Sequence, residues 1–170
     1  MKSLQERIIH ELGVKPEINV RAEIEQRSRF LMRYLGESGM RGFVLGISGG
    51  QDSLLAGMLA KRAVNLRHEE GGVAEFHAVL LPYGAQADGA DALLAVDTIA
   101  PDFVHDINIK PAVDASAQSF TDAAGDALSD FDRGNVKARE RMIAQYALAS
   151  KYGLLVIGTD HAAEAVTGFY

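Results

Sequence analysis

The segment Gly-Ile-Ser-Gly-Gly-Gln-Asp-Ser at residues 46–53 restricts the possible folds of this chain more than any other part of it. The apolar run 43–47 lacks polar alternation, which is typical of a strand covered on both faces. The residues that follow predict a helix over 53–66. We expect Gly49 and Gly50 to adopt positive φ and to let a ligand approach the backbone, because no Cβ intervenes. The sequence therefore predicts a strand, a tight turn and a helix that together form a binding site.

The composition of this glycine turn indicates a phosphate ligand. Main-chain amides of the turn and the positive N-terminal end of the helix attract anions, and Ser48 and Ser53 add hydroxyl donors. A Walker A loop has Lys before its hydroxyl residue, whereas Asp52 stands at that position here. A carboxylate beside a polyphosphate requires a bridging cation, so Asp52 predicts Mg²⁺ bound with ATP. Two alternatives stay open: a turn that uses glycine only for geometry, and Asp52 as a helix N-cap.

The rest of the chain alternates between helices and apolar strands. Further helices are predicted at 3–12, 19–37, 88–100, 113–124, 134–152 and from about His161. Further strands are predicted at 76–81, 103–109 and 154–157. This order favours an α/β fold with an open parallel sheet, helices on both faces and right-handed crossovers. Because ligands bind beyond the carboxyl ends of such strands, we expect the loop after 154–157 to meet the glycine turn.

Length and composition exclude several classes of protein. The 170 residues fit one domain, and 17 basic against 23 acidic residues give a net charge of −6, which argues against a protein that coats nucleic acid. No apolar run approaches the ~20 residues of a membrane span, and the N-terminus lacks a secretory core. We therefore expect a cytoplasmic protein with no membrane and no nucleic-acid partner. The absence of cysteine excludes disulfides, thiolate metal sites and a cysteine nucleophile.

One charged residue on the predicted helix 134–152 is unusual. Helical spacing puts four apolar residues on one face: Val136, Ile143, Tyr146 and Ala147. The opposite face carries three cations that we expect to be solvated: Arg133, Lys137 and Arg141. Arg139 lies at the edge of the apolar face, where an unpaired charge costs free energy. The pattern predicts an anionic partner for Arg139, either a buried carboxylate or a ligand phosphate.

The motifs together resemble a known family. The sequence Ser-Gly-Gly-Gln-Asp-Ser at 48–53 resembles the pyrophosphate loop of the ATP pyrophosphatase superfamily, whose members cleave ATP between the α and β phosphates. The segments 81–88, 129–142 and 158–170 extend the likeness to ammonia-dependent NAD synthetase over nearly the whole chain. This resemblance implies a Rossmann-like fold and a ligase of NAD biosynthesis. The enzyme would amidate deamido-NAD with ammonia through an adenylate, release AMP and pyrophosphate, and act as a homodimer.

The resemblance also implies roles for individual residues. Contacts to ATP are expected from nine residues: Gly46, Ile47, Ser48, Gly49, Gly50, Gln51, Asp52, Ser53 and Thr159. Asp52 and Glu164 would bind Mg²⁺, and Arg139 would contact deamido-NAD. Without the resemblance, Glu164 reads equally as an acid that complements a helix dipole, and His161 as a surface or cap residue. Leu80 departs from the family, which commonly has an ATP-contacting Arg there, so it is given no role.

Two other functions stay open at this point. A different adenylating ligase, such as a GMP synthetase-type enzyme, would share the glycine turn but should lack the segment 158–170. A non-catalytic nucleotide-binding module would need the turn but not Glu164. Family members continue beyond Tyr170, so we expect residues 1–170 to be one domain without its C-terminal part and weakly active or inactive alone. The lack of cysteine favours ammonia over glutamine as the nitrogen donor.

Overall fold

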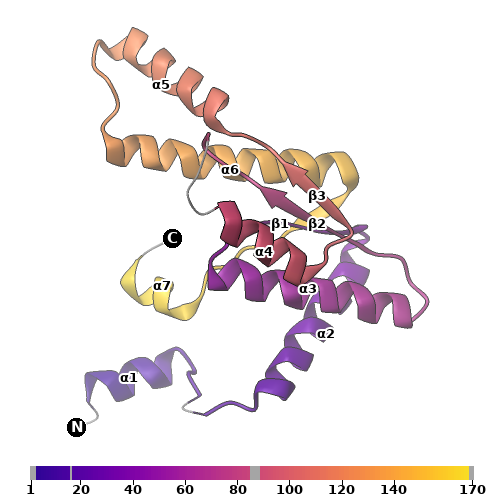
Figure 1. Ribbon diagram of the computed structural model, residues 1–170. Helices are drawn as coiled ribbons and strands as arrows, with labels where there is room; N and C mark the ends of the chain where they lie inside the picture. The colour runs from indigo at the N-terminus through magenta and orange to yellow at the C-terminus, as the bar shows by residue number, and fades with distance from the viewer. Residues whose placement is uncertain (1–2, 16, 85–88, 169–170) are drawn as a thin grey trace.

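Four parallel strands form a single sheet at the centre of the molecule (Figure 1). The computed structural model describes residues 3–15, 17–84 and 89–168. The strands are β1 (Gly42–Gly46), β2 (Glu75–Leu80), β3 (Phe103–Asp106) and β4 (Leu154–Val156). They lie in the order β3-β2-β1-β4, with Phe43 of β1 in register with Phe76 and Leu155. The predicted parallel α/β fold is therefore confirmed.

Helices cover both faces of this sheet (Figure 1). The described helices are α1 (Leu4–Glu11), α2 (Val20–Ser38), α3 (Gln51–Glu69), α4 (Gly89–Ile99), α5 (Lys110–Ala124), α6 (Asp130–Tyr152) and α7 (Ala162–Thr167). The helices α2, α3 and α4 pack on one face, and α5 and α6 pack on the other. Figure 1 shows α1 away from the sheet, and none of its residues is buried. None of the described helices is both long and apolar enough to span a membrane.

The central strands β1 and β2 lack polar alternation because both of their faces are buried, whereas Phe103 and Val104 of the edge strand β3 are about half exposed. Phe43 and Phe76 point toward α2, α3 and α4, where they join the larger cluster of buried side chains. Val44 and Val79 point to the other face and pack with Val113 of α5. Each of these side chains is almost fully buried. Apolar burial on both sides therefore fixes the sheet between two layers of helices.

The chain adds strands on one side of β1 and then on the other, so the strand order changes direction once. From β1 to β2 and from β2 to β3, the chain crosses through α3 and α4 on one face. It then passes through α5 and α6 on the other face and returns to β4, on the far side of β1. The segments that follow β1 and β4 thus leave the sheet as neighbours. In open α/β sheets this switch in strand order is where ligands bind.

Several predicted boundaries were wrong for local reasons. The strand predicted at 103–109 ends at Asp106, although the Ile107 and Ile109 amides still donate to the Leu80 and Pro82 carbonyl oxygens before α5 begins at Lys110. The helix predicted from residue 134 begins at Asp130, because Ser129 Oγ caps it by accepting from the Asp132 amide. The predicted start of a helix at residue 88 lies outside the described residues, as do residues 85–88 and 169–170 of the motifs 81–88 and 158–170.

The predicted orientation of α6 was also wrong. Ile143 and Tyr146 are 53% and 59% exposed, whereas the three cations expected in solvent are half-buried: Arg133, Lys137 and Arg141. The inward face of the helix combines apolar side chains that pack against the sheet, from Val136 to Ala149, with polar side chains that bond to the ends of the strands and to α5. The face that contacts the protein is therefore mixed in polarity, and an apolar face looks outward.

Candidate active site

The turn between β1 and α3 depends on one glycine in particular. Gly49 has φ +87°, and a Cβ on it would lie 2.9 Å from the backbone nitrogen of Ala92 in α4. Only glycine fits this combination of positive φ and close backbone approach. Gly50, for which we also predicted positive φ, has φ −75° and ψ 162° because it is the extended N-cap residue of α3. The prediction was right for Gly49 and wrong for Gly50.

Hydrogen bonds of two serine hydroxyls stabilise the turn. The Oγ atoms of Ser48 and Ser53 lie 3.1 Å apart, and Ser53 Oγ donates to the Gly50 carbonyl oxygen. The Gly50 amide in turn donates to Ser48 Oγ. Ser53 is only 6% exposed, so its hydroxyl supports the turn in this structure. No side chain among the described residues caps α3, and its first N–H groups are therefore available to an anion.

Two acidic side chains from distant parts of the chain come together beside this turn. Asp52 lies in the first turn of α3, and Glu164 lies in the first turn of α7. The Nε2 atom of His161 is 3.9 Å from Asp52 Oδ1 and 3.8 Å from Glu164 Oε2. His161 is the N-cap of α7, as expected for a cap residue, and its Nδ1 accepts from the Glu164 amide. The sheet topology thus brings both carboxylates to one imidazole.

This donor set fits a magnesium ion that arrives with a phosphate ligand. Mg²⁺ prefers oxygen ligands and is usually bound by one or two carboxylates together with substrate phosphates and water. Within the described part of the chain, no group of three or more His, Cys, Asp or Glu side chains is arranged to hold a metal ion. Asp52 and Glu164 therefore match a shared substrate–metal site better than a closed protein cage.

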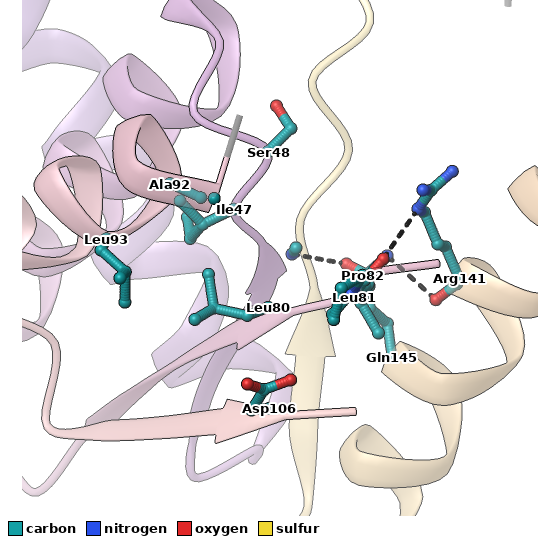
Figure 2. A pocket seen from close by; sticks show the side chains of 12 residues that line it. Ile47, Ser48, Leu80, Leu81, Pro82, Ala92, Leu93, Asp106, Arg141 and Gln145 are labelled. Atoms are coloured by element: carbon teal, nitrogen blue, oxygen red, sulfur yellow. Dashed lines mark hydrogen bonds between the residues drawn. The ribbon is translucent and has the colours of Figure 1, made fainter. Parts of the chain in front are cut away.

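A cavity of about 490 Å³ opens next to the turn (Figure 2). The apolar wall of the cavity is formed by β2, α4 and the segments that follow β1 and β2. Its residues are Ile47, Leu80, Leu81, Pro82, Ala92 and Leu93. Four further side chains add polar groups: Ser48, Asp106, Arg141 and Gln145. The cavity has the size and the mixed lining of a small-molecule site. Its position at the carboxyl ends of β1, β2 and β3 agrees with the rule for open parallel sheets.

Hydrogen bonds and ion pairs fix the segment that follows β2. The Tyr83 hydroxyl donates to Asp114 of α5, and Arg133 of α6 donates to both of these side chains. Lys110 also pairs with Asp114. The hydrogen bond from Lys110, followed by that from Tyr83, lowers the pKa of Asp114 to about 2. Asp114 therefore remains ionised and ties the segment after β2 to α5 and α6.

Of the predicted site residues, only Gly46, Ile47 and Ser48 line the cavity, and two of the others lie outside both the turn and the pair of carboxylates. Thr159 is half-buried in the connection between β4 and α7. Arg139 is exposed on the outer face of α6, where its Nη1 donates to the Asn135 carbonyl oxygen of the same helix. Arg139 was predicted at the edge of the apolar face of α6, and the expected burial of that face was wrong, because its side chains are exposed. Burial therefore gives no reason for an anionic partner of Arg139.

The cavity also contains residues that the sequence did not indicate. Asp106 comes from the end of β3, and Arg141 and Gln145 come from the inner face of α6. The spacing of Arg141 and Gln145, one helical turn apart, could have placed them on one face. Gln145 contacts the end of β1 and Arg141 contacts the segment after β2. These contacts depend on the fold, so no local sequence pattern predicts them.

The fold and the glycine turn define an α/β protein with an open parallel sheet and with its candidate site at a switch in strand order. A family model described as NAD synthase matches residues 23–170, and the chain belongs to this family. It is 57% identical to the NH(3)-dependent NAD(+) synthetase of Rhodococcus erythropolis. That alignment covers 100% of the chain and 62% of the relative. The chain thus spans about three fifths of the length of this curated relative.

Solved structures show the same relationship. The NAD+ synthetase of Burkholderia pseudomallei is similar with a TM-score of 0.87 and 47% identity, over 94% of this chain and 70% of that one. The NMN synthetase of Francisella tularensis has a TM-score of 0.75 and 29% identity, over 91% of this chain and 60% of that one.

A substitution pair tests the packing of the turn. We expect Gly49→Ala to lower the free energy of unfolding by about 1–3 kcal/mol, because the new Cβ meets the α4 backbone at positive φ. Gly50→Ala is the matched control and should change it by less than about 0.5 kcal/mol, since its Cβ meets only the Ser48 hydroxyl. Urea unfolding followed by circular dichroism measures both. Equal stability of the two variants would contradict the described turn.

Proposed function

We propose that the protein carrying this chain converts deamido-NAD, ATP and ammonia into NAD, AMP and pyrophosphate. Membership of the NAD synthase family supports this proposal, as does 57% identity to an NH(3)-dependent NAD(+) synthetase. The observation that carries it is the meeting of Asp52 and Glu164 beside the glycine turn, at the switch in strand order. The family match favours this reaction over that of a GMP synthetase-type ligase or a non-catalytic module.

ATP would bind across the turn and the neighbouring cavity. The adenosine would occupy the apolar part of the cavity, and the triphosphate would meet the amides at the start of α3. Residues 46–53 would surround the phosphates, with Ser53 acting from within the turn. Thr159 would approach the nucleotide from the segment after β4. The mixed lining of the cavity and its position beside an uncapped helix start support this arrangement.

Asp52 and Glu164 would hold a magnesium ion together with the phosphates. Such an ion offsets the negative charge of the triphosphate beside two carboxylates. The chain itself contributes the two first-turn acids, and the capping contact of His161 fixes the backbone from which Glu164 projects. Without this neutralisation, Asp52 would repel the ligand that the α3 amides attract.

The proposed reaction has two steps. A carboxylate oxygen of the nicotinate group attacks the α-phosphorus of ATP, the bond to the β-phosphate oxygen breaks, and pyrophosphate leaves. Ammonia then attacks the acyl carbon of the adenylate, AMP leaves with the bonding electron pair, and one proton is released from nitrogen. The turn and the α3 N-terminus accelerate the first step by orienting the phosphate and stabilising its developing charge.

The outer face of α6 would bind deamido-NAD and a second subunit. Arg139 projects from this face beside three exposed apolar side chains: Met142, Ile143 and Tyr146. An exposed apolar patch of this kind is typical of an interaction surface. A homodimer that covers it would enclose Arg139 in a cleft where its guanidinium could bind a dinucleotide phosphate. The exposure of this face supports both the dimer and the role of Arg139.

Product analysis tests the proposed reaction. The natural protein that carries this chain, supplied with deamido-NAD, Mg-ATP and ammonium, should form NAD, AMP and pyrophosphate in equal amounts. Chromatography of the nucleotides and an enzymatic pyrophosphate assay measure the three products. Binding of ATP without AMP formation would instead indicate a nucleotide-binding module. Faster amidation of nicotinate mononucleotide would indicate a mononucleotide substrate, as in the NMN synthetase neighbour.

The metal assignment predicts the behaviour of Asp52→Asn. Loss of one anionic ligand should lower turnover at least tenfold and raise the Mg²⁺ concentration needed for half-maximal rate. Stability should change by less than about 0.5 kcal/mol, because the Asp52 side chain is 62% exposed. Asp130→Asn removes a first-turn acid from another helix and is the matched control. An unchanged Mg²⁺ dependence in Asp52→Asn would contradict the assignment.

The role of Arg139 predicts a selective effect on one substrate. Arg139→Ala should raise the KM for deamido-NAD at least tenfold and change the KM for ATP less than twofold, since Arg139 does not line the nucleotide cavity. Steady-state kinetics with each substrate varied in turn measures both values. Arg67→Ala, near the opposite end of α3 from the glycine turn, should leave both unchanged. Equal increases for the two substrates in Arg139→Ala would exclude the proposed contact.

A further inference from the structure

At the end of β1, where the glycine turn begins, a side chain of α6 accepts the hydrogen bond that a neighbouring strand would otherwise accept. The strands β1 and β4 pair only as far as Val44 and Val156, with a last bond from the Ile157 amide to the Val44 carbonyl oxygen. Beyond this point the Gly46 amide donates to Gln145 Oε1 at 2.8 Å. A Cβ on Gly46 would lie 3.3 Å from the Gln145 side chain, so glycine permits this close contact. Gln145 therefore satisfies a backbone group where β1 and β4 separate.

The same face of α6 fixes an arginine at the cavity wall. Arg141 lies one helical turn before Gln145, and its Nε donates to the Leu81 carbonyl oxygen at 3.2 Å. Gln145 Nε2 donates to the Arg141 carbonyl oxygen at 3.3 Å. Figure 2 shows these bonds between α6 and the ends of β1 and β2. The Arg141 guanidinium is thus oriented by a backbone carbonyl.

Arg141 differs in its partners from Arg133, two turns earlier on the same helix. Arg133 pairs with the Asp114 carboxylate, whereas no carboxylate in the described part of the chain pairs with Arg141. Arg141 is half-buried and lines the cavity beside the turn. A partly desolvated cation without a carboxylate partner favours an anionic ligand, and guanidinium groups match phosphate geometry.

The charges that line the cavity are separated. Arg141 contacts the segment after β2, next to Gln145 and the start of the turn. Leu80, on the same wall of the cavity, is uncharged. Asp106 projects from the end of β3, on the side of β2 away from β1. A ligand with negative charge at the turn and a neutral, hydroxyl-bearing part toward β3 would fit this distribution. A nucleoside polyphosphate has this form.

We propose that Arg141 binds phosphate oxygens of ATP in this cavity and that Gln145 is a positioning residue for the turn. The proposal rests on the ATP binding proposed above. The Nη groups of Arg141 donate to the phosphates while its Nε remains bonded to Leu81. Gln145 keeps the Gly46 amide bonded and holds β1 apart from the segment after β4. The nucleotide site then includes α6 as well as the turn.

Calorimetric titration with two ligands tests the role of Arg141. Adenosine has no phosphate, so Arg141→Gln should weaken ATP binding at least tenfold and change adenosine binding less than twofold. Both titrations use the natural protein with Mg²⁺ and without deamido-NAD. Arg67→Gln is the matched control and should change neither affinity. If Arg141→Gln does not fold, Arg141→Lys serves instead and should still weaken ATP binding at least threefold relative to adenosine, because the planar donor pair is lost.

The outcomes separate this proposal from the proposed function. Equal weakening of ATP and adenosine would show that Arg141 only supports the wall through Leu81, and the proposal would be wrong. Unchanged ATP affinity would also overturn it. Absence of ATP binding by the wild-type protein would overturn both the proposed function and this contact. ATP binding by the wild type with no selective loss in the variant would leave the proposed function standing and reject Arg141 alone.

Discussion

The separation of β1 and β4 is the constraint on which the whole carboxyl edge depends. β1 is followed by the glycine turn and β4 by the segment that leads to α7, and the two strands are neighbours in the sheet although they lie far apart in the sequence. The turn after β1 enters α3, and the segment after β4 leads to the first-turn acid of α7. Because both segments leave the sheet at one point, Asp52 and Glu164 come within reach of His161 although they are far apart in sequence. No single loop could supply this arrangement.

The position of Gly49 shows how tightly the turn is built into the fold. Its positive φ bends the chain, and the missing Cβ lets the start of α4 pack directly on it. The same α4 residues then form one wall of the cavity. The conformation of one residue thus determines both the shape of the turn and the distance to the opposite wall. Hydrogen bonds of the Ser48 and Ser53 hydroxyls stabilise the turn, with Ser53 buried beneath it and Ser48 exposed at the cavity.

Local patterns in the sequence predicted most of the strands, the turn and the parallel sheet. Buried strands leave continuous apolar runs, and the glycines mark a bend that other residues do not adopt. The topology rule for open sheets predicted that the segments after β1 and β4 would be neighbours, and in the structure Asp52 and Glu164 each lie within 4 Å of His161 Nε2. Their binding of a metal ion remains a prediction.

The errors have a common physical origin. The face of α6 was assigned by counting apolar residues, but Arg133, Arg141 and Gln145 face inward because they bond to Asp114, Leu81 and Gly46. Hydrophobic periodicity contains no information about such distant partners. Gly50 was misjudged for a similar reason, since its φ is set by its place as an N-cap and not by its residue type.

The two faces of α6 have a mechanical consequence. On one side of this helix Gln145 accepts from the amide of Gly46, the last residue of β1, and the other side exposes Ile143 and Tyr146. The outer face and the Gly46 contact are thus separated by no more than the diameter of one helix of 23 residues. The surroundings of the outer face and the position of the Gly46 amide are therefore linked through this one helix.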